Sequence, residues 1–229
     1  MTTPLVVAPD PLAGLPDLLR WHLTRAKPDE DALALVKPGA TAETLYAAWM
    51  QNEFFASAVR LIAAVLPARE SVWWAWVSAR HATQMAGGTA PSEEVHTALN
   101  AIEQWIVRPD DNARRAVWDA GNAAGMDTPV GMVCAAVFLN GTSIAPPNIP
   151  AVPPPPGAAL PLISGVITLA ASANSDAKQI PPTLAAFAAQ GMEIVKRVGG
   201  WEQATKVAYE TLQRAQQEYA RVTQSPAGK

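Results

Sequence analysis

Apolar side chains recur at three- and four-residue steps along most of this 229-residue chain. Prolines and glycines interrupt these steps at short intervals, and no segment alternates convincingly between apolar and polar residues as a strand would. Such a pattern predicts short helices joined by short loops, which pack as antiparallel hairpins. We therefore expect an all-α fold, an irregular bundle of about ten short helices.

Capping residues and prolines set the expected ends of these helices. Thr41, Ser92 and Thr128 each precede a helical stretch, and their side-chain oxygens can accept a hydrogen bond from the first turn. Pro129 suits the first helical position, where a missing N–H costs nothing. The expected helices cover residues 11–25, 30–36, 42–51, 53–66, 68–85, 93–108, 112–124, 129–139, 162–173, 183–198 and 201–224.

The segment Ile144–Pro161 differs from the rest because prolines fill it and force an extended polyproline-II path. Ile144, Ile149 and Val152 stand between the prolines, and a free linker would be more polar. We interpret the segment as a strap lying against the helical body. A spacer between two units and a proline-rich ligand for another protein are the alternatives.

This strap divides the chain into parts. We expect an N-terminal helical unit at residues 1–139, the proline-rich strap or linker at 140–161, and a C-terminal three-helix unit at 162–224 packed on the first. Residues 225–229 should form a disordered tail.

Charge and hydropathy exclude several classes of protein. The net charge is −3 and the basic residues are scattered, whereas nucleic-acid binders cluster them. The N-terminus lacks the features of a signal peptide, and the most apolar stretch, residues 158–173, is too short to cross a bilayer. We therefore expect a cytoplasmic protein that binds neither nucleic acid nor membrane.

Motifs for catalysis, cofactors and metals are missing from the sequence. It contains no phosphate-binding loop and no nucleophile elbow. His22, His81 and His96 lie far apart, and the single cysteine, Cys134, sits in an apolar run that predicts a buried free thiol. We expect no catalytic residues, no cofactor and no metal, although two carboxylates could still meet through the fold.

One segment carries unusual chemistry. Trp73, Trp74, Arg80 and His81 fall on or beside one face of a helix that also holds Glu70. A cation and an imidazole near indole rings can bind an acidic or planar small molecule. Alternatively, the tryptophans fill the core, and Arg80 and His81 close a buried polar network with Glu70.

The last helix is amphipathic, with Trp201, Leu212 and Tyr219 on its apolar face. This face can pack within the chain, bind a partner helix, or join two copies of the chain.

Four segments together resemble a known family: Val72-Trp73-Trp74-Ala75, Ala79-Arg80-His81-Ala82, residues 123–129 and residues 143–156. The resemblance covers roughly residues 40–200. It is to an uncharacterised bacterial all-helical family, a domain of unknown function. That family is loosely associated with gene neighbourhoods of type VI secretion and of phosphothreonine-reading signalling modules.

These observations favour a non-catalytic protein-binding accessory or adaptor protein, and the resemblance points to a type VI secretion apparatus. Its partner would be another protein, such as a secretion component or an effector. The alternatives are a small-molecule-binding or enzymatic helical domain with its site at Arg80 and His81, and a protein that self-associates through the last helix.

Overall fold

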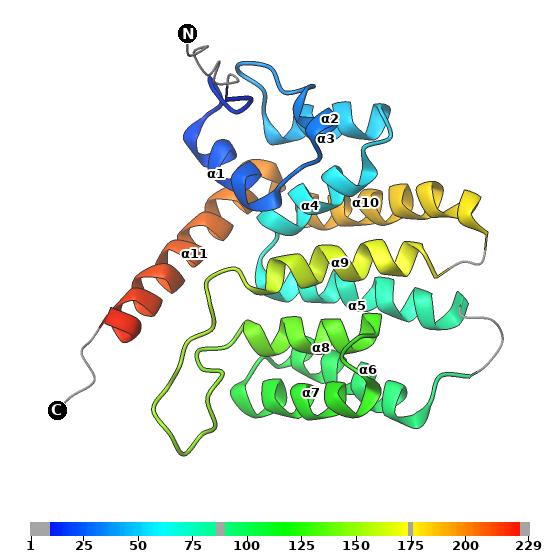
Figure 1. Cartoon of the computed structure of the whole chain (residues 1–229), viewed down its shortest axis with the longest axis vertical. Helices are drawn as coiled ribbons and strands as arrows, with labels where there is room; N and C mark the ends of the chain where they lie inside the picture. The colour runs from blue at the N-terminus through cyan, green and yellow to red at the C-terminus, as the bar shows by residue number, and fades with distance from the viewer. Residues whose placement is uncertain (1–9, 86–89, 174–175, 225–229) are drawn as a thin grey trace, which may run out of the picture.

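Helices make up all of the regular secondary structure that a computed structural model of the chain describes. The model describes residues 10–85, 90–173 and 176–224. Within these ranges it contains eleven α-helices, one short 3-10 helix and no strand (Figure 1). The predicted all-α fold class is confirmed. The tail at 225–229 and the glycine stop at Gly87-Gly88 lie outside the described residues.

The helices follow one another with few intervening residues. Before the strap they are α1 (Asp17–Ala26), α2 (Glu30–Leu33), α3 (Ala42–Gln51), α4 (Phe55–Val65), α5 (Ala68–Met85), α6 (Glu93–Val107), α7 (Asp111–Ala124) and α8 (Pro129–Leu139). After it come α9 (Ala159–Ala171), the 3-10 helix η1 (Ala177–Gln179), α10 (Ile180–Arg197) and α11 (Gly200–Gln224).

The capping residues act as the sequence predicts. The side chain of Thr41 accepts a hydrogen bond from the backbone N–H of Thr44, and that of Thr128 accepts one from Gly131. Ser92 caps α6 in the same way. Each of these side chains satisfies a backbone donor that the first helical turn leaves without a partner.

Two helices begin earlier than expected because prolines lie inside their first turns. Helix α9 starts at Ala159 and includes Pro161, and α10 starts at Ile180 and includes Pro181 and Pro182. A proline in the first turn loses no intrahelical hydrogen bond, since the N–H groups there have no helical acceptor. At the N-terminus the reverse holds: α1 begins only at Asp17, after a turn.

Helices from both sides of the strap share one core. Helices α6, α7 and α8 pack in succession, α9 packs against α5 and α8, and α10 packs against α4 and α9 (Figure 1). A single cluster of buried apolar side chains runs from Leu15 to Ala204. The helices after the strap therefore complete the packing of those before it.

Tryptophan side chains tie the alanine-rich helices together. The indole N–H of Trp74 in α5 donates to the carbonyl of Phe187 in α10 at 3.0 Å, and Trp74 has no exposed surface. Trp49 donates to Ala32 at 2.8 Å, and Trp76 donates to Leu99 at 2.9 Å. Each indole fills volume that alanines leave open and satisfies its own donor.

His22 joins three helices near the N-terminal end of the fold. Its side chain is completely buried, and its ring nitrogens lie 3.1 Å from the carbonyl oxygen of Ala64 in α4 and 2.9 Å from that of Thr205 in α11. A neutral imidazole can donate to only one of them. Burial nevertheless outweighs the two carbonyls and lowers the pKa of His22 from its ordinary value.

A glycine in α10 allows its contact with Trp74. A Cβ at Gly191 would lie 2.6 Å from the Trp74 ring, which is held between two helices. We expect Gly191→Ala to lower the free energy of unfolding by about 1–3 kcal/mol, although alanine favours helices. Gly165→Ala in α9 is the control, because its Cβ would meet only the end of the flexible Met132 side chain at 3.1 Å. Equal stabilities in urea unfolding would contradict this account.

The pKa of His22 predicts how stability depends on pH. Because the folded pKa lies below the ordinary 6.5, the unfolded chain binds more protons as pH falls below that value. The free energy of unfolding should therefore fall between pH 7 and pH 5.5 more steeply in the wild type than in His22→Gln. Chemical unfolding across this range measures both slopes, and parallel curves would refute the prediction.

Candidate functional site

The four residues predicted as a site on α5 are separated in the structure. Trp74 is buried, and Trp73 packs partly buried against the core. Arg80 is exposed, with its guanidinium carbon 4.7 Å from the centre of the Trp76 ring. His81 is half-buried with its ring edge against Phe187, 5.4 Å between centroids.

The predicted polar network around these residues is not formed. Among the contacts of the described residues, no hydrogen bond or ion pair joins Glu70 to Arg80 or His81. A cavity beside Arg25 and the strap and a second one beside Lys27 and Arg60 are not lined by Arg80 or His81. A binding role for this group stays a prediction.

The predicted partner face of α11 divides into a packed half and an open half. Trp201 is half-buried, its ring 5.8 Å from that of Tyr46, and Ala204 and Ala208 are buried. Beyond them, Leu212 and Tyr219 are each partly exposed. In Figure 1 this second half of α11 extends away from the stacked helices.

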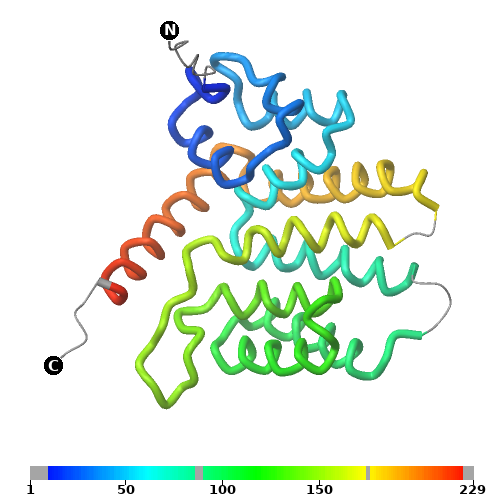
Figure 2. The backbone as a smooth tube through the Cα atoms, in the orientation of Figure 1, coloured from blue at the N-terminus to red at the C-terminus, as the bar shows by residue number. Residues whose placement is uncertain are grey.

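Because α9 begins at Ala159, the strap is shorter than the predicted 140–161 and covers residues 140–158, and it contains a closed loop. The backbone N–H of Ile144 donates to the carbonyl of Val152 at 2.8 Å, so the two ends of the loop are joined. Between them, the N–H of Ile149 donates to the carbonyl of Pro146 at 3.3 Å, which makes a turn at the tip. We call residues 144–152 the apolar loop; Figure 2 shows it as the long yellow-green excursion between α8 and α9.

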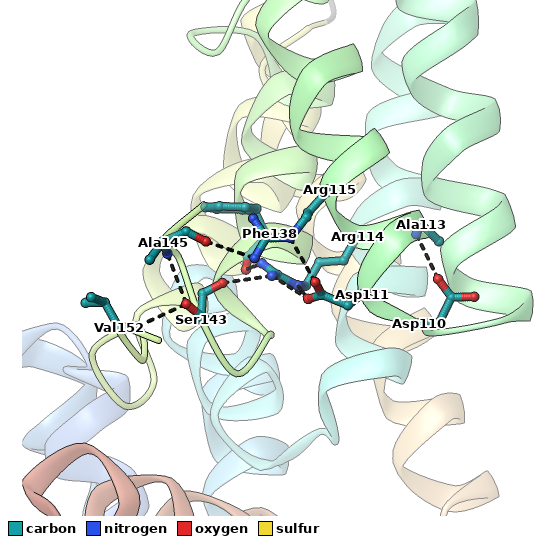
Figure 3. Close-up of polar contacts among 9 residues, drawn as sticks. All are labelled: Asp110, Asp111, Ala113, Arg114, Arg115, Phe138, Ser143, Ala145 and Val152. Atoms are coloured by element: carbon teal, nitrogen blue, oxygen red, sulfur yellow. Dashed lines mark hydrogen bonds and ion pairs between the residues drawn. The ribbon is translucent and has the colours of Figure 1, made fainter. Parts of the chain in front are cut away.

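Ser143 holds the base of the apolar loop. Its hydroxyl oxygen accepts hydrogen bonds from the backbone N–H groups of Ala145 at 3.1 Å and Val152 at 3.0 Å (Figure 3). One side chain thus satisfies a donor on each side of the loop, and this fixes how the chain enters and leaves it.

Two arginines of α7 attach this base to the helical body. Arg114 is almost fully buried, and its guanidinium donates to the carbonyl oxygens of Phe138 at 2.6 Å and Ser143 at 2.8 Å. Arg115 donates to the carbonyl of Ala145 at 2.9 Å (Figure 3). The strap is therefore bound at its start to α7 and to the end of α8.

Asp111 supplies the negative charge for both arginines. Its carboxylate accepts hydrogen bonds from Arg114 at 2.6 and 2.9 Å and from Arg115 at 2.8 Å. The hydrogen bonds from Arg115 and Arg114 lower the pKa of Asp111 below its ordinary value. The three side chains lie within one turn of α7, and this spacing brings acid and base together.

Three aliphatic side chains of the apolar loop face solvent, whereas Ala145 near its start is buried. Ile149 is 51% exposed, Val152 46% and Ile144 36%. No charged residue occurs anywhere between Thr142 and Ser175. The proline-rich segment was interpreted as a strap lying against the helical body. These three side chains do not lie against it, whereas Pro153, directly after the loop, is buried.

A comparison with protein-family models bears on the identity of the chain. The model of a family of unknown function, DUF6931, matches residues 45–195. The chain belongs to this family. The DUF6931 segment runs from α3 into α10, so it includes the strap and leaves out α1 and α11. Comparisons with curated proteins and with solved structures gave no match.

The described residues contain neither a cluster of metal ligands nor a membrane-spanning helix. Across residues 10–85, 90–173 and 176–224, no group of three or more metal-ligating side chains comes together. In the same ranges no helix has both the length and the hydropathy to cross a membrane.

Cys134 is fully buried as predicted, and burial raises the pKa of its thiol to about 12.

Removal of Arg114 should weaken the attachment of the strap. Arg114→Met leaves the carbonyls of Phe138 and Ser143 without their donor, so we expect a loss of about 2–4 kcal/mol in the free energy of unfolding. Arg108→Met is the matched control. The Arg108 side chain is 87% exposed, and we expect a change within about 0.5 kcal/mol. Denaturant unfolding compares the two variants, and equal losses would contradict the role of Arg114 in attaching the strap.

Proposed function

We propose that this chain is a non-catalytic accessory protein that binds another protein through its apolar loop. The observation that carries the proposal is the exposure of Ile144, Ile149 and Val152 on a loop whose base is fixed by hydrogen bonds. Exposed apolar side chains that are held in place are typical of an interaction surface.

The loop is already fixed in one conformation, and this lowers the entropy cost of binding a partner. A partner that covers apolar surface gains roughly 25 cal/mol for each Å² removed from water. A flexible loop would lose much of that gain because its backbone must be ordered on binding. The hydrogen bonds at Ser143 and the contacts with Arg114 and Arg115 order this loop beforehand.

The composition of the loop indicates the kind of surface it fits. It offers prolines and branched aliphatic side chains and has no charge. Apolar grooves lined by aromatic side chains recognise extended proline-rich segments, and the same groove chemistry suits the proline and aliphatic side chains of this closed loop. We therefore expect the partner to bind the loop in a groove whose floor has no charged residues. A charge covered by the loop would find no opposite charge on it.

The open half of α11 gives the partner a second place to bind. Leu212 and Tyr219 lie partly exposed on a helix that extends beyond the body. A partner helix could pack along this face. The apolar loop and α11 then act as two separate contacts of one accessory protein.

The resemblance to a family associated with type VI secretion gene neighbourhoods supports a more specific role. Under this proposal the protein works in the cytoplasm of a bacterium, and its partner is a component or an effector of the secretion apparatus. Neither nucleic acid nor membrane is part of this role.

The proposal predicts that two substitutions in the loop abolish binding without unfolding the protein. Tagged wild type and Ile149→Ser/Val152→Ser are expressed in the native host, purified by affinity and compared by quantitative mass spectrometry. At least one protein should be enriched with the wild type and reduced at least tenfold with the double variant. Both side chains are exposed, so stability should change by less than about 1 kcal/mol.

Val107→Ser is the control for that experiment. Val107 is 72% exposed at the end of α6 and lies outside the loop. The control should retain every partner of the wild type. Identical sets of captured proteins from the double variant and the wild type would refute a role for the loop. A dimer in light scattering that the double variant loses would show that the partner is a second copy of the chain.

A further inference from the structure

A cleft lies between the strap, α11 and the junction of α4 with α5. Its volume is about 260 Å³. Pro154–Pro156 form one wall, Leu212 and Ala215 of α11 form another, and Leu66 and Ile163 are among the apolar residues between them. The cleft is close to the lower limit of about 300 Å³ for typical small-molecule sites, so it fits a ligand smaller than a drug.

One charged side chain, Arg25, lines this cleft. Arg25 belongs to the last turn of α1, and its guanidinium carbon lies 5.0 Å from the centre of the Trp21 ring. Its Nη2 makes one long hydrogen bond, 3.4 Å, to the carbonyl of Pro156. Its Nε is buried and has no hydrogen-bond partner in the structure.

Arg25 has no carboxylate partner in the part of the chain that the structure describes. Among the described residues no Asp or Glu forms an ion pair with it. Arginine carries five N–H donors, and a partly buried guanidinium ordinarily uses several of them on an acid. Burial lowers the pKa of Arg25, because its charge has lost water without gaining an anion.

The strap brings its backbone unusually close to this guanidinium. Gly157 has φ of +77°, and a Cβ there would lie 1.6 Å from Nη2 of Arg25. Any other residue would displace the guanidinium from the mouth of the cleft. The cation is thus held beside an apolar space by a turn that only glycine forms without strain.

The remaining polar side chains that line the cleft indicate the charge of its ligand. No residue that lines it is acidic, so a cationic or zwitterionic ligand would find no counter-charge. The Ser71 hydroxyl already donates to the carbonyl of Ala68, and the Asn140 amide donates to that of Ala136. Thr211 adds one more neutral hydroxyl. The cleft therefore offers one positive group, a few neutral polar groups and an apolar surface.

We propose that this cleft binds a small carboxylate with an unbranched apolar body, and that Arg25 pairs with the carboxylate. The apolar body would lie against the prolines of the strap and Leu212. The carboxylate would accept hydrogen bonds from the guanidinium, in place of the water that the buried Nε has lost. The cleft shares Leu212 with the open half of α11 but shares no residue with the apolar loop, and its test needs no protein partner.

Octanoate is the probe for the test, and the purified full chain is titrated with it by calorimetry and by NMR. Octanoate should bind and shift the amide signals of residues that line the cleft. Arg25→Gln should weaken binding at least tenfold, because a charge-assisted hydrogen bond is lost. Octanol, which has the same chain without the charge, should also bind at least tenfold more weakly than octanoate.

Two further variants separate the site from a general effect on folding. Arg20→Gln, on the same helix but 51% exposed and paired with Asp10, should bind octanoate like the wild type. Ala215→Phe changes an exposed residue at the cleft and should block binding while the protein stays folded. Absence of binding at millimolar octanoate, equal binding of octanol, or full binding by Arg25→Gln or Ala215→Phe would each overturn the proposal.

Discussion

Burial of the Trp74 indole between α5 and α10 is the contact on which the rest of the fold depends. It joins a helix from before the strap to one from after it, over 113 residues of sequence. The indole ring lies beside the bare backbone of Gly191, so the two helices approach closely. Alanine-rich helices have little side-chain volume of their own, and a few large rings set the distances between them.

The position of the strap follows from this packing. Helices α9 and α10 must return to α5 and α4, so the chain between α8 and α9 has to cross the end of the stack. Arg114 and Arg115 hold the start of that crossing, and Arg25 contacts its end at Pro156. The segment between them has more residues than the crossing needs, and the surplus forms the apolar loop.

Local signals in the sequence predict most of the helices. Thr41, Ser92 and Thr128 cap helices as expected, because capping depends only on residues within one turn. The sequence places the starts of α9 and α10 too late, because a proline is usually taken as a helix boundary although the first turn of a helix accepts it. Whether a helix forms is thus a local property. Whether a proline precedes the helix or lies in its first turn depends on the surrounding fold.

The candidate site was much harder to predict, because tertiary contacts define it. Arg114 reads as half of a surface pair, yet its carbonyl acceptors lie 24 and 29 residues further on. Nothing near Arg25 in the sequence indicates that α11 and the strap will enclose it. The apolar residues between the prolines favour a strap against the body, but sequence spacing does not reveal that Ile144 and Val152 pair to close a loop that exposes them.

The prolines of the apolar loop have one further consequence, for solubility. Exposed aliphatic residues on an extended backbone ordinarily invite edge-to-edge strand pairing and aggregation. Pro146, Pro147 and Pro150 have no N–H to offer a neighbouring chain, and the N–H groups of Ile144, Ile149 and Val152 are already engaged. The loop therefore exposes its aliphatic side chains while offering few free N–H groups to a neighbouring strand.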